Sequence, residues 1–256
     1  MTLARLPPDC ANWHTGRPGR RTENEKTESE YQMALMSREY RFLYFQNPRT
    51  ASTATAALLR EIAGGEVIPE KNILNDDGTI RVPAKHTRLD QLVEHRLISA
   101  EVRRDYLKIV TVRNPFDSLV SLWAKMNHDY VKLLEDENSW VHRKPDYKEK
   151  LEASVGLSFP EWVQMMHGER FRKGQTTHAN GLYMKGMDVM LRFERLQEQF
   201  AEVARRLQLP GDHVLPRQNV TQGREDKDYR SYYDDETRRI VAGVFAPEIK
   251  ALGYEF

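Results

Sequence analysis

Cysteine is nearly absent from this sequence: Cys10 is the only one among 256 residues, so no internal disulfide can form. Long apolar runs are also missing. The mean hydropathy is -0.71, and no stretch approaches the roughly 20 apolar residues of a membrane-spanning helix. Because no continuous apolar run follows the N-terminal arginines, we expect neither a cleaved secretory signal nor a membrane anchor. These features favour a cytoplasmic protein that does not bind membranes.

The sequence also lacks an excess of charge of one sign, since 39 Lys and Arg residues are balanced by 38 Asp and Glu residues, for a formal net charge of +1. This balance does not indicate a nucleic acid as a partner, so any anion site must be local. Five scattered histidines show no metal-ligand spacing to one another or to Cys10, and we predict no metal ion. These are His128, His142, His167, His178 and His213.

Residues 1–38 mix Pro, Gly, Arg, Glu and Thr without periodicity, and such a composition cannot bury enough apolar surface to order itself. We therefore expect a flexible N-terminal arm over 1–38 and a single domain over 39–256. A lid or a dimer contact is the alternative role for the arm. The sequence does not choose between them, and it leaves the oligomeric state open.

Three strand-to-helix units follow one another along the chain. The first begins with the short aromatic run RFLYFQNP and continues into a helix over 52–62, which Gly64 ends. The third joins a strand over 187–194 to a helix with an apolar stripe that stops before Pro210. Each unit predicts a strand followed by a tight connection and a helix.

In the second unit, the β-branched run 106–112 leads through Arg-Asn-Pro into FDSLVSLWAKM. Asn114 is suited to the N-cap of this helix and Pro115 to its first position. A last helix, over 235–252, is expected to pack on the sheet. Repeated units of this kind predict an α/β fold, a three-layer sandwich around a mostly parallel sheet, with ligands bound at the carboxyl ends of the strands.

The loop NPRTASTAT, at Asn47 to Thr55, has the components of an anion site. A strand end, the cation of Arg49 and a helix N-terminus come together there, and the helix dipole favours negative charge. Four hydroxyls accompany them, on Thr50, Ser52, Thr53 and Thr55. The loop is not the Walker pattern, because it has no glycine and its cation precedes the hydroxyls. Taken alone, the segment is equally compatible with a plain helix cap.

A second loop, RNPFDSLVS, places Arg113 at a strand end and Ser121 two turns into the next helix, and an arginine fork with a hydroxyl can hold a second phosphate. Together the two loops resemble the signature loops of the sulfotransferases that use 3′-phosphoadenosine 5′-phosphosulfate (PAPS). The resemblance is to the carbohydrate-type branch and its bacterial members, with a first loop similar to that of the heparan sulfate 2-O-sulfotransferases. It covers about residues 41–256, including the ending YYDDETRRIVAGVFAPEIKALGYEF.

The resemblance implies a fold related to the nucleotide kinases, in which a P-loop-like first loop binds the 5′-phosphosulfate and the second loop binds the 3′-phosphate. It implies PAPS as donor and 3′-phosphoadenosine 5′-phosphate (PAP) as product, without a metal. The implied 5′ contacts are Arg49, Thr50, Ala51, Ser52, Thr53 and Ala54, and the implied 3′ contacts are Arg113 and Ser121. A later stretch resembles the family's loop over the nucleotide and adds Arg217, Asn219, Arg224 and Tyr229, with a polar surface loop as the alternative.

Two residues are candidates for catalysis. Arg49 stands where the carbohydrate branch usually has lysine, and because a guanidinium stays protonated we assign it stabilisation of the leaving group only. His86 is the first choice for the base, since imidazole titrates near neutral pH and the related 2-O-sulfotransferases have histidines in a comparable segment. In the alternative, His86 has no catalytic role and only precedes a helix whose N-cap is Thr87. Glu66 or Glu70 is the rival base.

The predicted function is transfer of a sulfuryl group from PAPS to a hydroxyl of a small-molecule or carbohydrate acceptor by in-line displacement. One alternative is a phosphoryl transferase (kinase), which predicts a magnesium ligand and a fuller phosphate loop, neither of which the sequence shows. The other is a nucleotide-binding module without catalysis. The choice of acceptor depends on the segment at about 127–182, where Trp140 and Trp162 could stack on a ring of the acceptor. Trp123 could do the same, but it falls on the core face of its helix.

Overall fold

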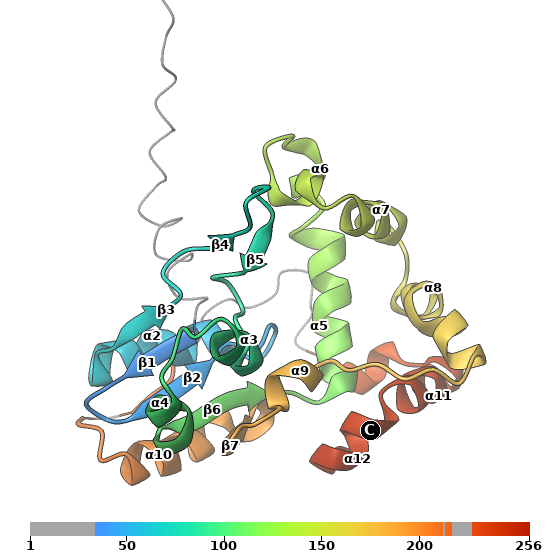
Figure 1. Ribbon diagram of the computed structural model, residues 1–256. Coiled ribbons are helices and arrows are strands. Elements are labelled where there is room, and N and C mark those ends of the chain that lie inside the picture. The colour runs from blue at the N-terminus through green and yellow to red at the C-terminus, as the bar shows by residue number, and fades with distance from the viewer. Residues whose placement is uncertain (1–33, 212, 217–226) are drawn as a thin grey trace, which may run out of the picture.

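The computed structural model describes residues 34–211, 213–216 and 227–256 (Figure 1). Three of the expected nucleotide contacts, Arg217, Asn219 and Arg224, lie outside the described residues, as does most of the expected N-terminal arm. Tyr229 and all the other predicted site residues lie within them.

A five-stranded sheet in the order β3-β1-β2-β6-β7 forms the centre of the molecule. The strands are β1 (Ala34–Ser37), β2 (Phe42–Phe45), β3 (Glu66–Ile68), β6 (Leu107–Val112) and β7 (Val189–Arg192). β2, β6 and β7 are parallel, whereas β1 is antiparallel to both of its neighbours. Since β3 thereby runs in the same direction as β2, four of the five strands share one direction, and the prediction of an α/β fold with a mostly parallel sheet is confirmed.

The domain begins earlier than predicted, because the last residues of the expected arm form a strand of the sheet. All four residues of β1, Ala34–Ser37, are buried, and the strand pairs with both β2 and β3. A four-residue run is too short to show a period, and its strand conformation depends on partners on both sides. The expected boundary at residue 38 is therefore wrong, and the sheet already includes Ala34.

The alternation of side chains along the strands produces two packed faces. Phe42 and Tyr44 pack with α2 (Ser52–Ala63) and α10 (Leu196–Arg206) on one face of the sheet. Leu43 and Phe45 pack on the other face with three helices, α3 (Leu89–Glu94), α4 (Ala100–Asp105) and α12 (Ala246–Leu252). The sheet is thus the middle one of three layers.

A helical lobe lies beside the sheet and surrounds α5 (Pro115–His128), as Figure 1 shows. It contains α8 (Phe159–Arg172) and α11 (Asp235–Val244), which pack against each other. The shorter elements of this part of the chain are α6 (Lys132–Glu135), η1 (Trp140–Arg143), α7 (Pro145–Ser154) and η3 (Tyr229–Tyr232). Asn114 caps α5 and Pro115 is its first residue, as predicted.

The last helix differs from the prediction, because it is divided at Phe245 into α11 and α12. Pro247 lies in the first turn of α12, where its missing N–H group does no harm, but it cannot continue the hydrogen bonds of a preceding helix. The apolar residues of α11 pack into the helical lobe rather than on the sheet, and only α12 reaches the sheet layer. The expectation that 235–252 packs as one helix on the sheet is therefore wrong.

The remaining elements connect these parts. A small antiparallel ribbon consists of β4 (Ile73–Leu74) and β5 (Ile80–Val82). α9 (Gly181–Met184) precedes β7, and η2 (Phe193–Arg195) follows it.

Candidate active site

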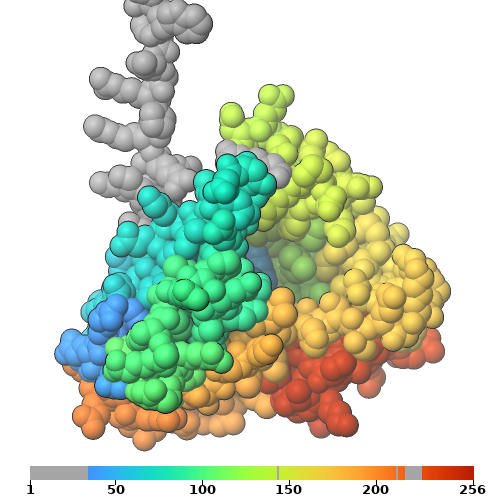
Figure 2. Space-filling model, viewed as in Figure 1, coloured from blue at the N-terminus to red at the C-terminus, as the bar shows by residue number. Residues whose placement is uncertain are grey.

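The carboxyl ends of β2 and β6 open into a hollow of the molecular surface. Figure 2 shows this hollow between the β4–β5 ribbon and the α6–α7 segment, with atoms of the blue and green parts of the chain at its floor. The two predicted loops, which follow β2 and β6, lie at this end of the sheet. This is the edge at which α/β proteins bind ligands.

The first loop is held by its own hydroxyl groups. The Oγ atoms of Thr50 and Ser52 each donate a hydrogen bond of 2.8 Å to the backbone oxygen of Asn47. Both side chains are buried, so these two hydroxyls shape the loop instead of extending from it. Arg49 and Ala51 adopt left-handed conformations, with φ of 67° and 56°, on either side of Thr50.

The helix that follows this loop begins without a side-chain cap. Its N-cap residue, Ala51, forms no side-chain hydrogen bond to the first turn, which contains Ser52, Thr53 and Ala54. An uncapped helix start leaves backbone N–H groups that favour an anion. The side chain of Arg49 reaches Tyr130, whose hydroxyl lies 3.3 Å from Nη2.

In the second loop, Arg113 is buried and occupied by contacts within the protein. Its Nε donates to Asp117 Oδ2 at 2.7 Å, and its Nη1 donates to the backbone oxygen of Arg49 at 2.9 Å. The guanidinium also lies over the ring of Phe193, 4.1 Å from the centroid. Arg113 thereby joins the two loops directly. Ser121 is buried in the next helix, α5.

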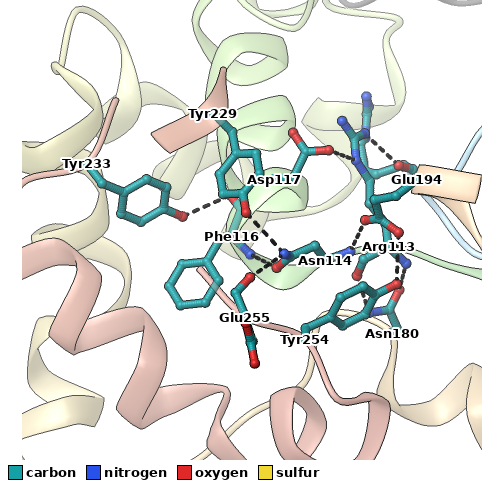
Figure 3. Close-up of polar contacts among 11 residues, drawn as sticks. Arg113, Asn114, Phe116, Asp117, Asn180, Glu194, Tyr229, Tyr233, Tyr254 and Glu255 are labelled. Atoms are coloured by element: carbon teal, nitrogen blue, oxygen red, sulfur yellow. Dashed lines mark hydrogen bonds and ion pairs between the residues drawn. The ribbon is translucent and has the colours of Figure 1, made fainter. Parts of the chain in front are cut away.

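Asn114 is the centre of a second group of contacts at the start of α5, shown in Figure 3. Its side chain accepts from the backbone N–H of Phe116 and donates to the backbone oxygen of Glu255. Tyr229, a predicted nucleotide contact, has its hydroxyl 3.3 Å from Asn114 Nδ2. The Glu194 carboxylate accepts from the backbone N–H of Asn114 at 2.7 Å. The structure thus places Tyr229 beside the second loop.

The side-chain amide of Asn180 connects both loops and uses its full hydrogen-bonding capacity. Its Oδ1 accepts from Asn47 Nδ2 at 2.8 Å and from the backbone N–H of Arg113 at 3.0 Å. Its Nδ2 donates to the backbone oxygen of Arg113 and to the carboxylate of Glu248. Glu248 is buried in α12 and also accepts from the backbone N–H groups of Ala179 and Asn180. Asn180 therefore adds a second link between the loops, beside the direct bond from Arg113 to Arg49.

His86 lies at the end of β2, close to the first loop. Its Nδ1 is 2.9 Å from the backbone oxygen of Gln46, and because a carbonyl only accepts, Nδ1 must carry the proton. In the neutral ring the lone pair is then on Nε2. Burial lowers the pKa of His86 below its ordinary value of 6.5, and the nearby charges of Lys85, Arg49 and Lys144 lower it further, whereas the hydrogen bond to Gln46 raises it.

The backbone around His86 is also fixed. His86 has a φ of 58°, and its backbone oxygen accepts a hydrogen bond of 2.9 Å from the hydroxyl of Tyr183. Burial raises the pKa of Tyr183 to about 12, so this hydroxyl stays protonated and can donate. Thr87 does not cap the following helix as the structural alternative expected, because its hydroxyl donates to the backbone oxygens of Pro83 and Ala84. The N-cap of α3 is Arg88.

The rival glutamates lie elsewhere. Glu66 is the first residue of β3 and pairs with Met36, so it lies at the edge where the strands begin, opposite the loops. Its carboxylate forms an ion pair of 2.7 Å with Arg38. Glu70 follows β3 on the far side of β1 and is exposed. Of the three candidate bases, the structure brings only His86 together with Arg49.

Several residues of the site carry no local sequence signal. Asn180 lies 133 residues from Asn47 and 67 from Arg113, so only the fold brings these residues together. Tyr130 and Tyr183 belong to neither of the two loops that the sequence singles out. Trp162, one of the tryptophans considered for stacking, is fully buried and cannot contact an acceptor.

A model of the sulfotransferase family matches residues 32–255, and the chain therefore belongs to this family of transferases. Comparisons with curated proteins and with solved structures gave no significant match. Within the described ranges, no group of three or more His, Cys, Asp or Glu side chains is arranged to hold a metal ion. No helix in the described part of the chain is both long and apolar enough to cross a membrane.

Proposed function

We propose that this protein transfers a sulfuryl group from PAPS to a hydroxyl group of an acceptor, with a carbohydrate as the favoured acceptor class. The single observation that carries the proposal is the hydrogen bond of His86 to Gln46, at the strand end that leads into Arg49 and the uncapped start of α2. An in-line transfer requires a base on one side of the sulfur and a cation on the other, and we assign these roles to His86 and Arg49. Family membership supports the same reaction class.

In this mechanism Nε2 of His86 accepts the proton of the acceptor hydroxyl as its oxygen forms the new bond to sulfur. The bond from sulfur to the bridging oxygen breaks, and negative charge grows on the departing 5′-phosphate. Arg49 and the backbone N–H groups of Ser52, Thr53 and Ala54 stabilise that charge. The products are a sulfate ester and PAP, with the proton held on His86.

Two features of the first loop fit an anion. The left-handed residues Arg49 and Ala51 enclose Thr50, an alternation typical of the concave arrangement of N–H groups that binds phosphate. The helix start has no side-chain cap, which leaves its dipole available. The hydroxyls of Thr50 and Ser52 act indirectly in this proposal, by holding the loop through Asn47, so the P-loop-like character of the segment rests on its backbone.

We assign the 3′-phosphate to Arg113 and Ser121. Since Arg113 is paired with Asp117, a phosphate here shares the guanidinium with that carboxylate, and the contact to Arg49 links the two ends of the nucleotide site. We place Tyr229 on the same side of the nucleotide, because its hydroxyl contacts Asn114 of the second loop. Arg217, Asn219 and Arg224 complete the proposed nucleotide contacts.

Nucleotide binding is the first test. PAP is expected to raise the midpoint temperature of unfolding (Tm) in a concentration-dependent way, because a ligand that binds only the folded state stabilises it. ATP with magnesium is expected to produce little change. Stabilisation by ATP with magnesium alone would instead support a phosphoryl transferase. If PAP stabilises the protein but labelled sulfate never moves from PAPS to sugars or phenols, the chain is a binding module.

The pH dependence of the reaction tests the base. Because His86 must be neutral to accept a proton and its pKa is below 6.5, most of the enzyme is active at pH 7. We expect kcat/KM to be flat near neutral pH and to fall as the pH drops below 6.5, with one titrating group on the acid side. An acid limb centred above 6.5 would contradict the burial and the cationic surroundings of His86.

A further inference from the structure

The segment that contains His86 is a turn, which spans residues 83–87. The hydroxyl of Thr87 donates to the backbone oxygens of Pro83 and Ala84 and thereby holds the two ends of the turn together. His86 itself is left-handed, with a φ of 58°, a conformation that a side chain other than glycine keeps only where its surroundings hold it. The position of the imidazole therefore depends on what attaches this turn to the rest of the molecule.

His86 is attached through both its ring and its backbone. Nδ1 of the ring donates to the backbone oxygen of Gln46, which directly follows β2, at 2.9 Å. The backbone oxygen of His86 accepts a hydrogen bond of 2.9 Å from the hydroxyl of Tyr183, 97 residues further along the chain in α9. The first bond fixes the rotation and the tautomer of the ring, and the second fixes the backbone from which the ring extends. Together they define where Nε2 lies.

The helix that contains Tyr183 is itself linked to both predicted loops. Asn180 is the N-cap residue of α9, and its side chain bonds to Asn47 and to the backbone of Arg113. The backbone N–H of Tyr183 donates to the backbone oxygen of Asn180 at 2.9 Å. α9 also contacts β6 in the centre of the molecule (Figure 1). The hydroxyl that holds the proposed base thus comes from the same short element that connects the loops.

The ring of Tyr183 has apolar contacts of its own. Tyr183, Leu89 and Met184 all pack against the apolar cluster on the α3 and α4 face of the sheet. Gly186 follows α9 with a φ of 77°, and a Cβ atom there would lie 2.9 Å from Cδ2 of Leu89. The chain after α9 therefore approaches the start of α3 closely. Because this packing does not use the hydroxyl, removing the hydroxyl leaves the ring in place.

From these contacts we infer that Tyr183 is a positioning residue for the reaction: its hydroxyl holds the backbone of His86 so that Nε2 meets the acceptor hydroxyl. The inference rests on the proposed function, in which His86 is the base. Tyr183 acts only through His86 and contacts neither the donor nor the acceptor. When the backbone bond is lost, Nε2 shifts relative to the acceptor oxygen, and proton transfer slows because it depends on hydrogen-bond geometry.

Tyr183→Phe removes the hydroxyl and keeps the ring. We expect kcat for sulfate transfer to be about 3- to 10-fold lower than in the wild type, the usual effect of losing one hydrogen bond, with an unchanged KM for PAPS. The increase in Tm with PAP should also be unchanged. The matched control is Tyr106→Phe, which removes the same atom just before β6, at the edge of the sheet opposite the loops. Its kcat should stay within about twofold of the wild type, because distant sites act independently.

The same substitution in a His86→Asn background shows whether Tyr183 acts through His86. Once the base is removed its position has no effect, so the double variant should have a kcat within about twofold of that of His86→Asn alone. A further loss of about 3-fold or more in the double variant would overturn the inference. A wild-type kcat in Tyr183→Phe, or a smaller increase in Tm with PAP, would also overturn it.

A readout without turnover separates this inference from the proposed function. Nitrogen NMR of isotope-labelled histidine identifies the ring nitrogen that carries the proton, and the signals of His86 are those missing from His86→Asn. We expect the Nδ1–H form in the wild type and a larger share of the Nε2–H form in Tyr183→Phe, because a looser backbone weakens the bond to Gln46.

The two possible failures then differ. If the tautomers of His86 shift in Tyr183→Phe but the wild type transfers no sulfate from PAPS, the proposed function fails and the positioning of the imidazole stands. If the wild type transfers sulfate and Tyr183→Phe changes neither the tautomers nor kcat, the inference fails and the proposed function stands.

Discussion

Replacement of His86 by Asn is expected to lower kcat by about 10²- to 10⁴-fold, the usual contribution of a general base. Asparagine tolerates the left-handed backbone that His86 adopts, at a φ of 58°, and its amide can still donate to Gln46. The loop should therefore keep its shape while the lone pair on Nε2 is lost. Transfer of labelled sulfate from PAPS to an accepted substrate, measured under saturating conditions, gives the value of kcat.

The binding of PAP to the His86→Asn variant shows whether the variant has lost only the base or also the folded structure. Because His86 makes no contact with the proposed phosphate positions, the Tm increase with PAP should equal that of the wild type. His95→Asn is the matched control, since His95 ends the next helix, α3, and has no part in the mechanism. Full activity in His86→Asn, with PAP binding intact, would show that another group accepts the proton.

The strand-to-helix units were predictable because their signals are local. Gly64 ends α2, Asn114 caps α5, and the alternation in Phe42–Phe45 sends side chains to both faces of the sheet. Each of these depends on a few adjacent residues. The division at Phe245 also had a local signal in Pro247, but apolar residues at helical spacing on both sides concealed it.

Contacts between distant segments could not be predicted in the same way. The four residues of β1 form a strand because β2 and β3 flank them, and the hydroxyls of Thr50 and Ser52 could have faced a ligand or the loop itself. Sequence spacing places Arg113 at a strand end but does not reveal that Asp117 and the first loop already bind it. The residue types of the site were therefore predictable, whereas their partners depend on the tertiary structure.

Among the residues whose partners depend on the tertiary structure, Asn180 is the one whose substitution is expected to lower the stability of the fold most. Asn180→Asp removes two hydrogen-bond donors, so the Arg113 backbone oxygen loses a partner, and it places a second carboxylate beside that of Glu248. Asn180 and Glu248 are each only 2% exposed, so the repulsion between the two carboxylates is weakly screened by water. A buried charge without a partner costs about 3–5 kcal/mol, which corresponds to a decrease in Tm of roughly 6–20 °C.

Asn75→Asp is the control for the chemical change, because Asn75 lies in an exposed turn where a carboxylate can still accept from Arg81. Its Tm should stay within about 2 °C of the wild type, since surface substitutions usually change stability by no more than about 0.5 kcal/mol. A Tm of Asn180→Asp equally close to the wild type would contradict the network of four hydrogen bonds.

Asn180→Asp also tests whether Asn180 positions the nucleotide loops or only stabilises the fold. Val163→Ala opens a cavity in the helical lobe, where Val163 of α8 is fully buried and belongs to neither loop. Both variants are less stable, but the Tm increase with PAP should be preserved in Val163→Ala and reduced in Asn180→Asp, because the lost bond to the Arg113 backbone oxygen and the repulsion from Glu248 displace the side chain that bonds to both Asn47 and Arg113. Equal increases in the two variants would assign Asn180 a purely structural role. If only Asn180→Asp loses the Tm increase with PAP, the position of the two loops relative to each other determines how well a nucleotide with phosphates at both ends can bind. Asn180, which belongs to neither loop, would then help to set that position.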